Sequence, residues 1–535
     1  MINCSNILRR SAICTLFLFV IIALYKFNQL DLMANNTYFE VANHELKLQV
    51  NELNIELQDA KLQINRLIRQ VYGKKHDNFA TVENPYFAEY ELQRRSLGYN
   101  IDELRSYLDA ELTRIEKYAK ISLTITKDNV ADRMRHIVAL FRNLQNVDGY
   151  DLYREKEAAK IKSLITSRFI KYQTTPDNNV VGCKINIPCG FGCQMHHVLY
   201  CATFAYNTQR RLILDTNSWS YGNKEAFLQI FKELPKPATK KSLHFRPWSG
   251  NLSYPAIKLG LFKDLNPRPN FIPLAIPNHL SKSTIIMSLH GNPFTLYAGH
   301  LIQMVFSIQP EFQQMVNDTQ TRLDFSSPVV GIHVRRTDKI GTEARFYHFE
   351  KYMTHVEEFF KIEEFRHKRK LKRKVFVATD DPNLLDGASD RYPDYQFLYN
   401  KNSTLSASLN NRYSKASSVF VILDILLLSK CDFIVCTFSS NVCRLAYELM
   451  QTRYPDGSWR FRSLDYIYHY NSQLPHNYIA IEDHTQSGDI SFVKGDIIGI
   501  DFNNWNGYCK GTNKRTNEMG LFPCYKTVDQ FLTAP

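Results

Sequence analysis

The segment GIHVRRTDKIGTE, residues 331–343, combines residue types that can bind an anion and move a proton. Arg335 and Arg336 are adjacent, and planar guanidiniums suit bidentate contacts with phosphate oxygens. For Arg336 a structural salt bridge is the alternative, and Asp338 can hold one of the two arginines in place. Further along the segment, a second cation and a carboxylate follow at Lys339 and Glu343.

A second stretch, CTFSSNVCRLAYELM at 436–450, has the composition of a turn between a strand and a helix. Ser439 and Ser440 occupy the turn, where N-cap residues are favoured. Free backbone N–H groups at a helix N-terminus, together with a hydroxyl, can bind an anion, and simple capping is the alternative explanation for the serines. Cys436 and Cys443 bracket this turn.

A third stretch, CGFGCQMHHVLYC at 189–201, places small residues beside two histidines. Gly190 and Gly192 allow the backbone to approach a ligand closely. His196 and His197 are adjacent, so on a helix their side chains diverge and do not face one ion. We therefore predict no metal site.

Carboxylates end or interrupt two further apolar runs. Asp380 and Asp381 follow a short β-branched run, and Asp424 lies within the apolar segment VFVILDILLL. A buried carboxylate needs a partner, so Asp424 is either a satisfied core acid or an acceptor for a nucleobase N–H.

A sheet is expected to position these residues. From residue 175 onward, short apolar runs, which are candidate strands, alternate with helix-like segments. The runs lie at 212–214, 329–334, 375–378 and 433–435. Runs that are apolar on both faces predict parallel strands covered by helices in a doubly wound α/β fold. Such sheets bind ligands at the carboxyl ends of their strands, which brings the charged segments to one rim.

The N-terminal segment predicts a membrane anchor. An Arg pair ending at Arg10 precedes the uncharged stretch 11–25, which ends at Lys26. Fifteen residues make about 22 Å of helix, which is shorter than a ~30 Å hydrocarbon core. The side chains of Arg10 and Lys26 can extend to the membrane surface and so make up the difference in length. A cleaved signal peptide is the alternative. We favour a cytoplasmic tail at 1–10 and an uncleaved anchor at 11–28, with the remainder luminal.

The rest of the chain divides by composition. Heptads predict a coiled-coil stem at 29–80, for which a helix packed on its own domain is the alternative. Helical periodicity continues over 81–174, the α/β region covers 175–474, and alternating short strands at 476–535 resemble an SH3-type barrel. The net charge of +13 suits an anionic partner without specifying one. The eleven cysteines lack paired zinc-knuckle spacing, so in an oxidising lumen they favour disulfides.

Together, the motifs HVRRTDKIGTE, ATDDP, NRYSKASSVFVILDI and CTFSSNVCRLAYE resemble those of the eukaryotic α1,6-fucosyltransferases that modify N-glycan cores. The resemblance covers residues 30–530. It implies a GT-B-like, Golgi type II membrane enzyme that needs no metal or other cofactor. The implied reaction moves fucose, with inversion, from GDP-fucose to the 6-hydroxyl of the Asn-linked GlcNAc of N-glycans with an exposed GlcNAc on the α1,3 arm. A homodimer through the stem and the SH3-like domain is also expected, and nucleic acid is not a partner.

The same resemblance implies a role for each matching residue. Arg335 and Ser440 would bind the β-phosphate, and His333 and Asp424 the guanine, with Tyr221 nearby. Glu343 would be the general base in relay with Lys339, and both would meet the acceptor with Asp264. The residues that would complete or brace the donor site are Arg336, Asp338, Tyr352, Asp380, Asp381, Ser439, Gly190 and Gly192. The implied disulfides are Cys183–Cys201, Cys189–Cys193 and Cys436–Cys443.

The sequence departs from the family at three places. Asn441 stands where the family usually has Gln, and Ile187-Pro188 replaces a Lys-Gly pair near the acceptor. One family disulfide has no cysteines here, whereas Cys509 and Cys524 are additional, and we predict that these two pair within the SH3-like domain.

Three competing interpretations are less consistent with the sequence. Protein O-fucosyltransferases share the His-x-Arg strand end but generally lack the stem and the C-terminal domain. A Golgi sulfotransferase would need a phosphosulfate loop near its N-terminal strand, and the sequence shows none. A glycan-binding head on a coiled-coil tether would release no GDP from GDP-fucose, so an activity assay distinguishes it from an enzyme.

Overall fold

The computed structural model describes residues 87–176, 179–235, 243–269, 274–337, 341, 345–407, 411–470 and 476–534. The predicted tail, anchor and stem therefore lie outside the described residues. Within the described part of the chain, no helix combines the length and the apolar character needed to cross a bilayer.

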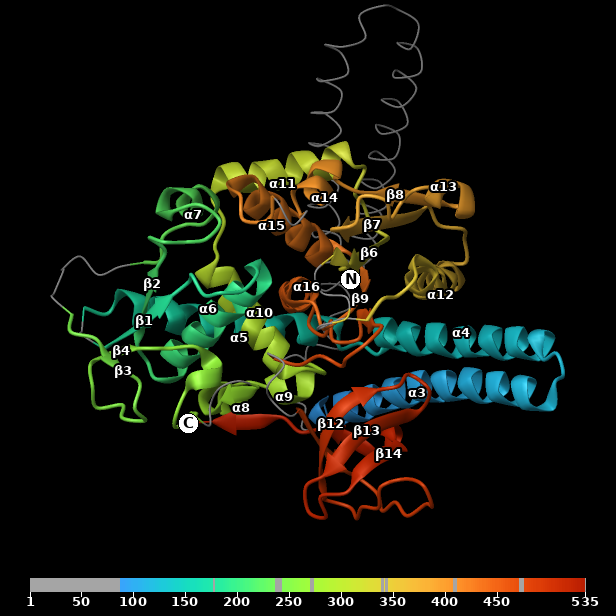
Figure 1. Ribbon diagram of the computed structural model, residues 1–535. Helices are drawn as coiled ribbons and strands as arrows, with labels where there is room; N and C mark the ends of the chain where they lie inside the picture. Colours follow the sequence, from blue (N-terminus) through green and yellow to red (C-terminus); the bar gives the residue numbers. More distant parts are fainter. Residues whose placement is uncertain are drawn as a thin grey trace, which may run out of the picture. The chain divides into compact units, whose positions relative to one another are not determined.

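Three long helices open the described part of the chain, within the region predicted to be helical. They are α3 (Phe87–Ala119), α4 (Thr124–Val147) and α5 (Asp151–Thr174). Figure 1 shows α3, in blue, and α4, in cyan, as an antiparallel hairpin. Arg105 of α3 and Arg135 of α4 both donate to the carboxylate of Glu358, at 3.0 and 2.8 Å. Glu358 belongs to α12 (Phe349–His367), so these ion pairs attach the hairpin to the α/β region.

The first α/β sheet is parallel and has the strand order β2-β1-β4-β3. Its strands are β1 (Val180–Lys184), β2 (Arg211–Asp215), β3 (Arg246–Pro247) and β4 (Ala256–Lys258). The helices α6 (Phe191–Asn207) and α10 (Pro293–Val305) belong to the same half of the α/β region. The side chain of Asn292 accepts the N–H of Thr295 at the start of α10, and Pro293 fits the first helical position, where no N–H partner is needed.

The second sheet is also parallel, with the order β10-β9-β6-β7-β8. Its strands are β6 (Val329–Val334), β7 (Arg373–Thr379), β8 (Tyr395–Leu398), β9 (Phe433–Cys436) and β10 (Phe461–Ser463). Every residue of β6 is buried, as the run without alternation predicted. The chain proceeds outward from β6 to β8 and then returns to β9 on the other side of β6. The strand order therefore reverses between β6 and β9, and doubly wound sheets bind ligands at such a reversal. Two parallel sheets agree with the predicted α/β class.

Helices α11 (Pro310–Arg322), α15 (Lys415–Lys430) and α16 (Asn441–Gln451) complete this half, and α15 packs against α16. The side chain of Ser414 accepts the N–H of Ser417 at 3.1 Å and so caps α15. The shorter elements are α7 (Lys224–Ile230), η2 (Phe262–Asp264), α8 (Asn278–Ser283), α9 (Ile286–Leu289), α13 (Ala388–Arg391), α14 (Lys401–Ser406) and η4 (Cys524–Lys526).

The C-terminal domain is a five-stranded antiparallel sheet, as the alternating pattern predicted. Its strands are β11 (His476–Ala480), β12 (Ile497–Asn503), β13 (Tyr508–Asn513), β14 (Met519–Pro523) and β15 (Thr527–Asp529). The domain contacts α3: Asn503 donates to Glu103 at 3.0 Å, and Gly507, at φ +87°, lies against Tyr107.

The last strand of the described chain pairs outside the C-terminal sheet. β16 (Leu532–Ala534) leaves the C-terminal domain and pairs in parallel with β5 (Ala275–Pro277) of the α/β region. The chain end is thus hydrogen-bonded to the α/β region, a long-range pairing that no local pattern signals.

Candidate active site

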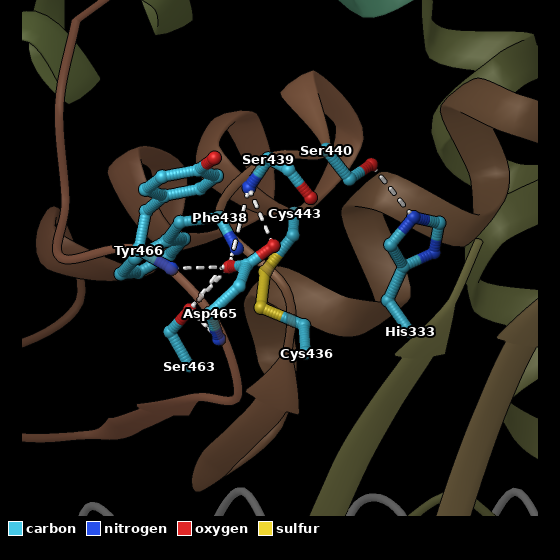
Figure 2. The surroundings of a disulfide bond; sticks show 9 residues. All are labelled: His333, Cys436, Phe438, Ser439, Ser440, Cys443, Ser463, Asp465 and Tyr466. Carbon is cyan, nitrogen blue, oxygen red and sulfur yellow. Dashed lines mark hydrogen bonds between the residues drawn. A yellow bond between two sulfur atoms is a disulfide. The ribbon is translucent and has the colours of Figure 1, made fainter. Parts of the chain in front are cut away.

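The carboxyl end of β6 places a buried histidine beside the first turn of α16. His333 Nε2 and Ser440 Oγ lie 2.9 Å apart, and both residues are buried (Figure 2). Burial lowers the pKa of His333 to about 4, so the imidazole is neutral at neutral pH. A neutral ring can either donate to the serine hydroxyl or accept from it.

The turn before α16 is held on both sides. The Cys436–Cys443 disulfide joins the end of β9 to the first turn of α16 (Figure 2). Asp465 accepts the Ser439 N–H at 3.4 Å and the Tyr466 N–H at 2.6 Å. Because Ser440 faces His333, its hydroxyl does not cap its own helix. Of the two explanations for the serines, simple capping is therefore not the one that the Ser440 side chain adopts.

The two adjacent arginines are each held by one aspartate from the end of β7. Arg335 is ion-paired with Asp380, and Arg336 with Asp381. Asp380 also accepts the Arg336 backbone N–H at 2.8 Å and the Thr337 hydroxyl at 2.5 Å. The two carboxylates thus fix the directions of both guanidiniums at the rim. The salt-bridge alternative for Arg336 agrees with this geometry, as does the bracing role of the aspartates.

Sequence reasoning missed a third guanidinium at this rim. Arg412 donates to the Thr337 hydroxyl at 3.0 Å and lies 3.9 Å from an Asp380 oxygen. It stands in the segment NRYSKASSVFVILDI, but its separation from β6 in sequence hid the contact. Tyr221 lies close by: its ring packs at 5.3 Å from that of Tyr413, and burial raises its pKa to about 12.

The two glycines at the start of α6 have different surroundings. Gly190 is the exposed N-cap, and a Cβ added there would meet nothing within 4 Å. A Cβ on Gly192 would lie 2.8 Å from the Cβ of Asn441 and 2.9 Å from its carbonyl carbon. Gly192 therefore allows α6 to approach α16. The contact that the structure shows for Gly192 is with α16, whereas Gly190 faces open space, and a role of either glycine in ligand binding stays a prediction.

Two predicted donor-site residues lie in the interior. Asp424, on α15, is buried, and desolvation raises its pKa to about 7, with Ser403 as its hydrogen-bonding neighbour. Its hydrogen-bonding neighbour is therefore Ser403, whereas that of His333 is Ser440, and a shared role of the two residues in guanine binding stays a prediction. Tyr352 is 2% exposed in the core beneath β6, where burial raises its pKa. That position fits bracing.

The acceptor side is described only in part. Asp264 is exposed in η2, a few residues beyond the carboxyl end of β4. The proposed base and its neighbours, Asp338, Lys339 and Glu343, lie outside the described residues.

Four disulfides form in the pairs that were predicted. They are Cys183–Cys201, Cys189–Cys193, Cys436–Cys443 and Cys509–Cys524. Cys183, Cys201 and His197 place possible ligand atoms within 4.8 Å of one another, but both sulfurs belong to one disulfide. His196 instead lies 3.1 Å from the buried Glu448.

The two parallel sheets, with guanidiniums and a helix N-terminus at the reversal of strand order, define a doubly wound α/β protein with a charged rim at that reversal. Residues 10–469 match the family model described as alpha-(1,6)-fucosyltransferase N- and catalytic domains. The chain belongs to the alpha-(1,6)-fucosyltransferase family.

Named relatives agree with this assignment. The chain is 36% identical over 464 residues to an alpha-(1,6)-fucosyltransferase of Drosophila melanogaster, covering 83% of this chain and 74% of the relative. It is also 36% identical over 452 residues to one of Caenorhabditis elegans, covering 82% and 79%. A solved structure of the fucosyltransferase NodZ from Bradyrhizobium matches with 15% identity over 50% of this chain and 92% of that one, at a TM-score of 0.30. That similarity is too distant to bear on the assignment.

Proposed function

We propose that this enzyme transfers fucose from GDP-fucose, with inversion, to the 6-hydroxyl of the Asn-linked core GlcNAc of N-glycans. Family membership supports fucosyl transfer, and the rim at the reversal between β6 and β9 supports the position of the donor. The single observation that carries the proposal is the contact between Ser440, which follows β9, and His333, which lies on β6 two residues before Arg335.

Catalysis requires stabilisation of the negative charge that grows on the departing GDP. Arg335 and the first turn of α16 are arranged to stabilise that charge more strongly in the transition state than in the ground state. Asp380 orients the Arg335 guanidinium, and Arg412 adds positive charge beside it. The hydrogen bond with His333 fixes the position of the Ser440 hydroxyl at the start of α16.

The acceptor hydroxyl is a poor nucleophile, so a carboxylate must remove its proton during attack on the face opposite the diphosphate. We assign that role to Glu343, with Lys339 as its relay. Both residues belong to the segment that joins Arg336 to α12, and α12 is anchored to the helical hairpin through Glu358.

The donor base would be recognised by His333 and Asp424, with Tyr221 forming an aromatic wall. An ionised carboxylate can accept the N–H groups of guanine. Because the pKa of Asp424 is about 7 in the unliganded protein, guanine binding would favour loss of its proton.

We further propose that the reaction needs no divalent ion, since guanidiniums supply the positive charge that a metal supplies elsewhere. Dialysis against EDTA should leave the transfer rate unchanged. A loss of activity that Mg²⁺ or Mn²⁺ restores would contradict this part of the proposal.

The membrane and assembly properties are also proposals. Residues 11–28 would anchor the enzyme in the Golgi membrane with its catalytic region luminal, and 29–80 would form a coiled-coil stem below an SH3-like C-terminal domain. Protease protection of the catalytic region in sealed Golgi vesicles, lost on adding detergent, is the expected result. Digestion in intact vesicles would contradict the orientation.

A homodimer is supported by an exposed apolar stripe on α4. Ile137, Leu140, Leu144 and Val147 recur at helical spacing and are 44%, 59%, 56% and 77% exposed. Such a stripe is costly in water and is typical of helix–helix contacts. Light scattering should give a dimer for the full chain and a shift toward monomer for Leu140→Lys/Leu144→Lys. If the double variant has the same mass in solution as wild type, α4 is not part of the dimer interface.

The activity test uses GDP-fucose and a biantennary glycopeptide with an exposed GlcNAc on its α1,3 arm. We expect mass spectrometry to find one added fucose on the Asn-linked GlcNAc. A matched glycopeptide with a 6-deoxy core GlcNAc should remain unmodified. Fucose on a peptide hydroxyl or on an outer-arm sugar would contradict the proposed acceptor.

A further inference from the structure

A cavity of about 380 Å³ lies between α6 and α10 on one side and α15 and α16 on the other. Its walls are mainly apolar and include Met195, Phe306, Ile425 and Leu449. This volume falls within the range of small-molecule sites, about 300–1,000 Å³. The wall contributed by α16 comes from its C-terminal half, whereas the donor rim uses the N-terminus of that helix.

Two cations line the same cavity without an acidic partner. Among the described residues, neither Lys430 nor Arg453 has a carboxylate oxygen within the 4.0 Å of an ion pair. Lys430 instead donates to the side-chain oxygen of Gln320 at 2.5 Å. Arg453 donates to the carbonyls of Ser429 and Cys431 at 3.0 and 3.1 Å. Neutral acceptors thus hold both cations in place, and in the described part of the chain neither cation forms an ion pair with a carboxylate.

The electrostatics of Lys430 agree with this view. Partial burial lowers the pKa of Lys430, and the like charge of Arg453 lowers it further. An anion placed between the two groups would relieve both effects. Charge complementarity therefore selects an anionic head group at this wall, and the apolar walls select a hydrocarbon chain.

We propose that this cavity binds a single-chain amphiphile with an anionic head, of which a fatty-acid carboxylate is the simplest member. The chain lies along Met195, Phe306 and Leu449, and the carboxylate bridges Lys430 and Arg453. A neutral apolar ligand would leave both charges uncompensated, and a sugar nucleotide would lose the hydration of its polar groups against apolar walls. The head-group cations lie at the C-terminal ends of α15 and α16, away from the rim at the N-terminus of α16, so we expect the ligand and GDP to bind together.

The test is photolabelling of the full chain, purified in a neutral sugar-headed detergent, with a diazirine-bearing dodecanoate. We expect crosslinks on peptides of the four cavity helices, reduced by unlabelled dodecanoate and unaffected by GDP. A matched probe with the same chain but an alcohol head should label at least about tenfold less, because a charge-assisted contact contributes at least that factor. Equal labelling by both probes, labels outside these helices, or displacement by GDP would overturn the proposal.

Variants separate the head-group site from the chain site. Lys430→Gln/Arg453→Gln should reduce dodecanoate labelling at least about tenfold, and Leu449→Trp should block it by filling the cavity. Lys171→Gln, on the exposed face of α5, is the matched charge control and should label like wild type. An unfolding temperature like that of wild type, together with retained fucosyl transfer, establishes that each variant is folded. If the folded double variant labels like wild type, the two cations do not hold the ligand and the proposal fails.

Discussion

Two helices begin in similar surroundings in this protein, but their chemistry differs. Each of α6 and α16 follows a strand of a parallel sheet and has a disulfide at its first turn, Cys189–Cys193 in one case and Cys436–Cys443 in the other. The two N-termini meet where Gly192 contacts Asn441. Around α16, however, a neutral histidine and a serine face the turn, and two Arg–Asp pairs lie at the neighbouring strand ends. Around α6, Gly190 presents only backbone.

This difference shows how one interface divides its tasks. In the proposed mechanism, the α16 side carries the fixed charge for the leaving diphosphate, because carboxylates orient its guanidiniums before any ligand arrives. The α6 side supplies shape, because glycine permits two helices to approach within van der Waals contact. Most of the following experiments alter residues on one side of this interface and leave the other side unchanged.

The largest effect is expected when the charged side loses its central guanidinium. Arg335→Ala should reduce kcat/KM about a thousandfold and weaken GDP binding, because a preorganised donor to the developing charge is removed. Lys184→Ala is the matched control at the carboxyl end of β1, in the first sheet, and should change GDP affinity little. Steady-state kinetics and calorimetry measure both. Similar losses in the two variants would show that the sheets are not functionally different.

Removing the proposed base should separate chemistry from donor binding. Glu343→Gln should reduce kcat by about a hundredfold or more, since the acceptor hydroxyl would have no group to take its proton. GDP affinity should remain close to that of wild type, unlike in Arg335→Ala. A comparable loss of GDP affinity in both variants would contradict the division of roles.

The buried acid on α15 predicts a pH dependence of GDP binding. The pKa of Asp424 is raised to about 7, so below pH 7 the unliganded protein holds it protonated and unable to accept guanine N–H groups. GDP affinity should therefore rise with pH between 6 and 8, by up to about tenfold per unit below the pKa. His333, with a pKa of about 4, does not titrate in this window. Asp424→Asn should bind weakly with a flat profile. An equally steep profile in Asp424→Asn would exclude this carboxyl as its source.

The smallest effect concerns shape at the contact between the helices. Gly192→Ala should destabilise the fold by about 1–3 kcal/mol, because its Cβ would meet the Asn441 backbone. Gly190→Ala has open space around the new methyl group and should be near neutral. Chemical denaturation of both variants measures the difference. If the two variants have equal free energies of unfolding, α6 and α16 can move apart to accept the methyl group without loss of stability.

Much of the site could be predicted from local sequence, because a continuous buried strand followed by charge is a local pattern. β6 and β7 place their charged ends together by the geometry of parallel sheets, which is why Arg335, Asp380 and Ser440 were predictable as one rim. The pairing of Cys183–Cys201, Cys189–Cys193 and Cys436–Cys443 needed the family resemblance, whereas Cys509–Cys524 was predicted from two cysteines that the family pattern does not contain.

The remainder depends on long-range packing that no local pattern carries. Arg412 reaches Thr337 across 75 positions, and β16 pairs with a strand far back in the chain. Gly192 looked like a ligand-binding glycine but contacts a helix. Both uses require the absence of a side chain, so the sequence does not distinguish them.

A crystal structure of the enzyme with GDP tests the central claim most directly, namely that the rim between β6 and β9 holds the leaving diphosphate. We expect the β-phosphate within hydrogen-bonding distance of the Arg335 guanidinium and the Ser440 turn, with no divalent ion between them. A nucleotide bound at another surface, with no phosphate oxygen near Arg335, would contradict the account.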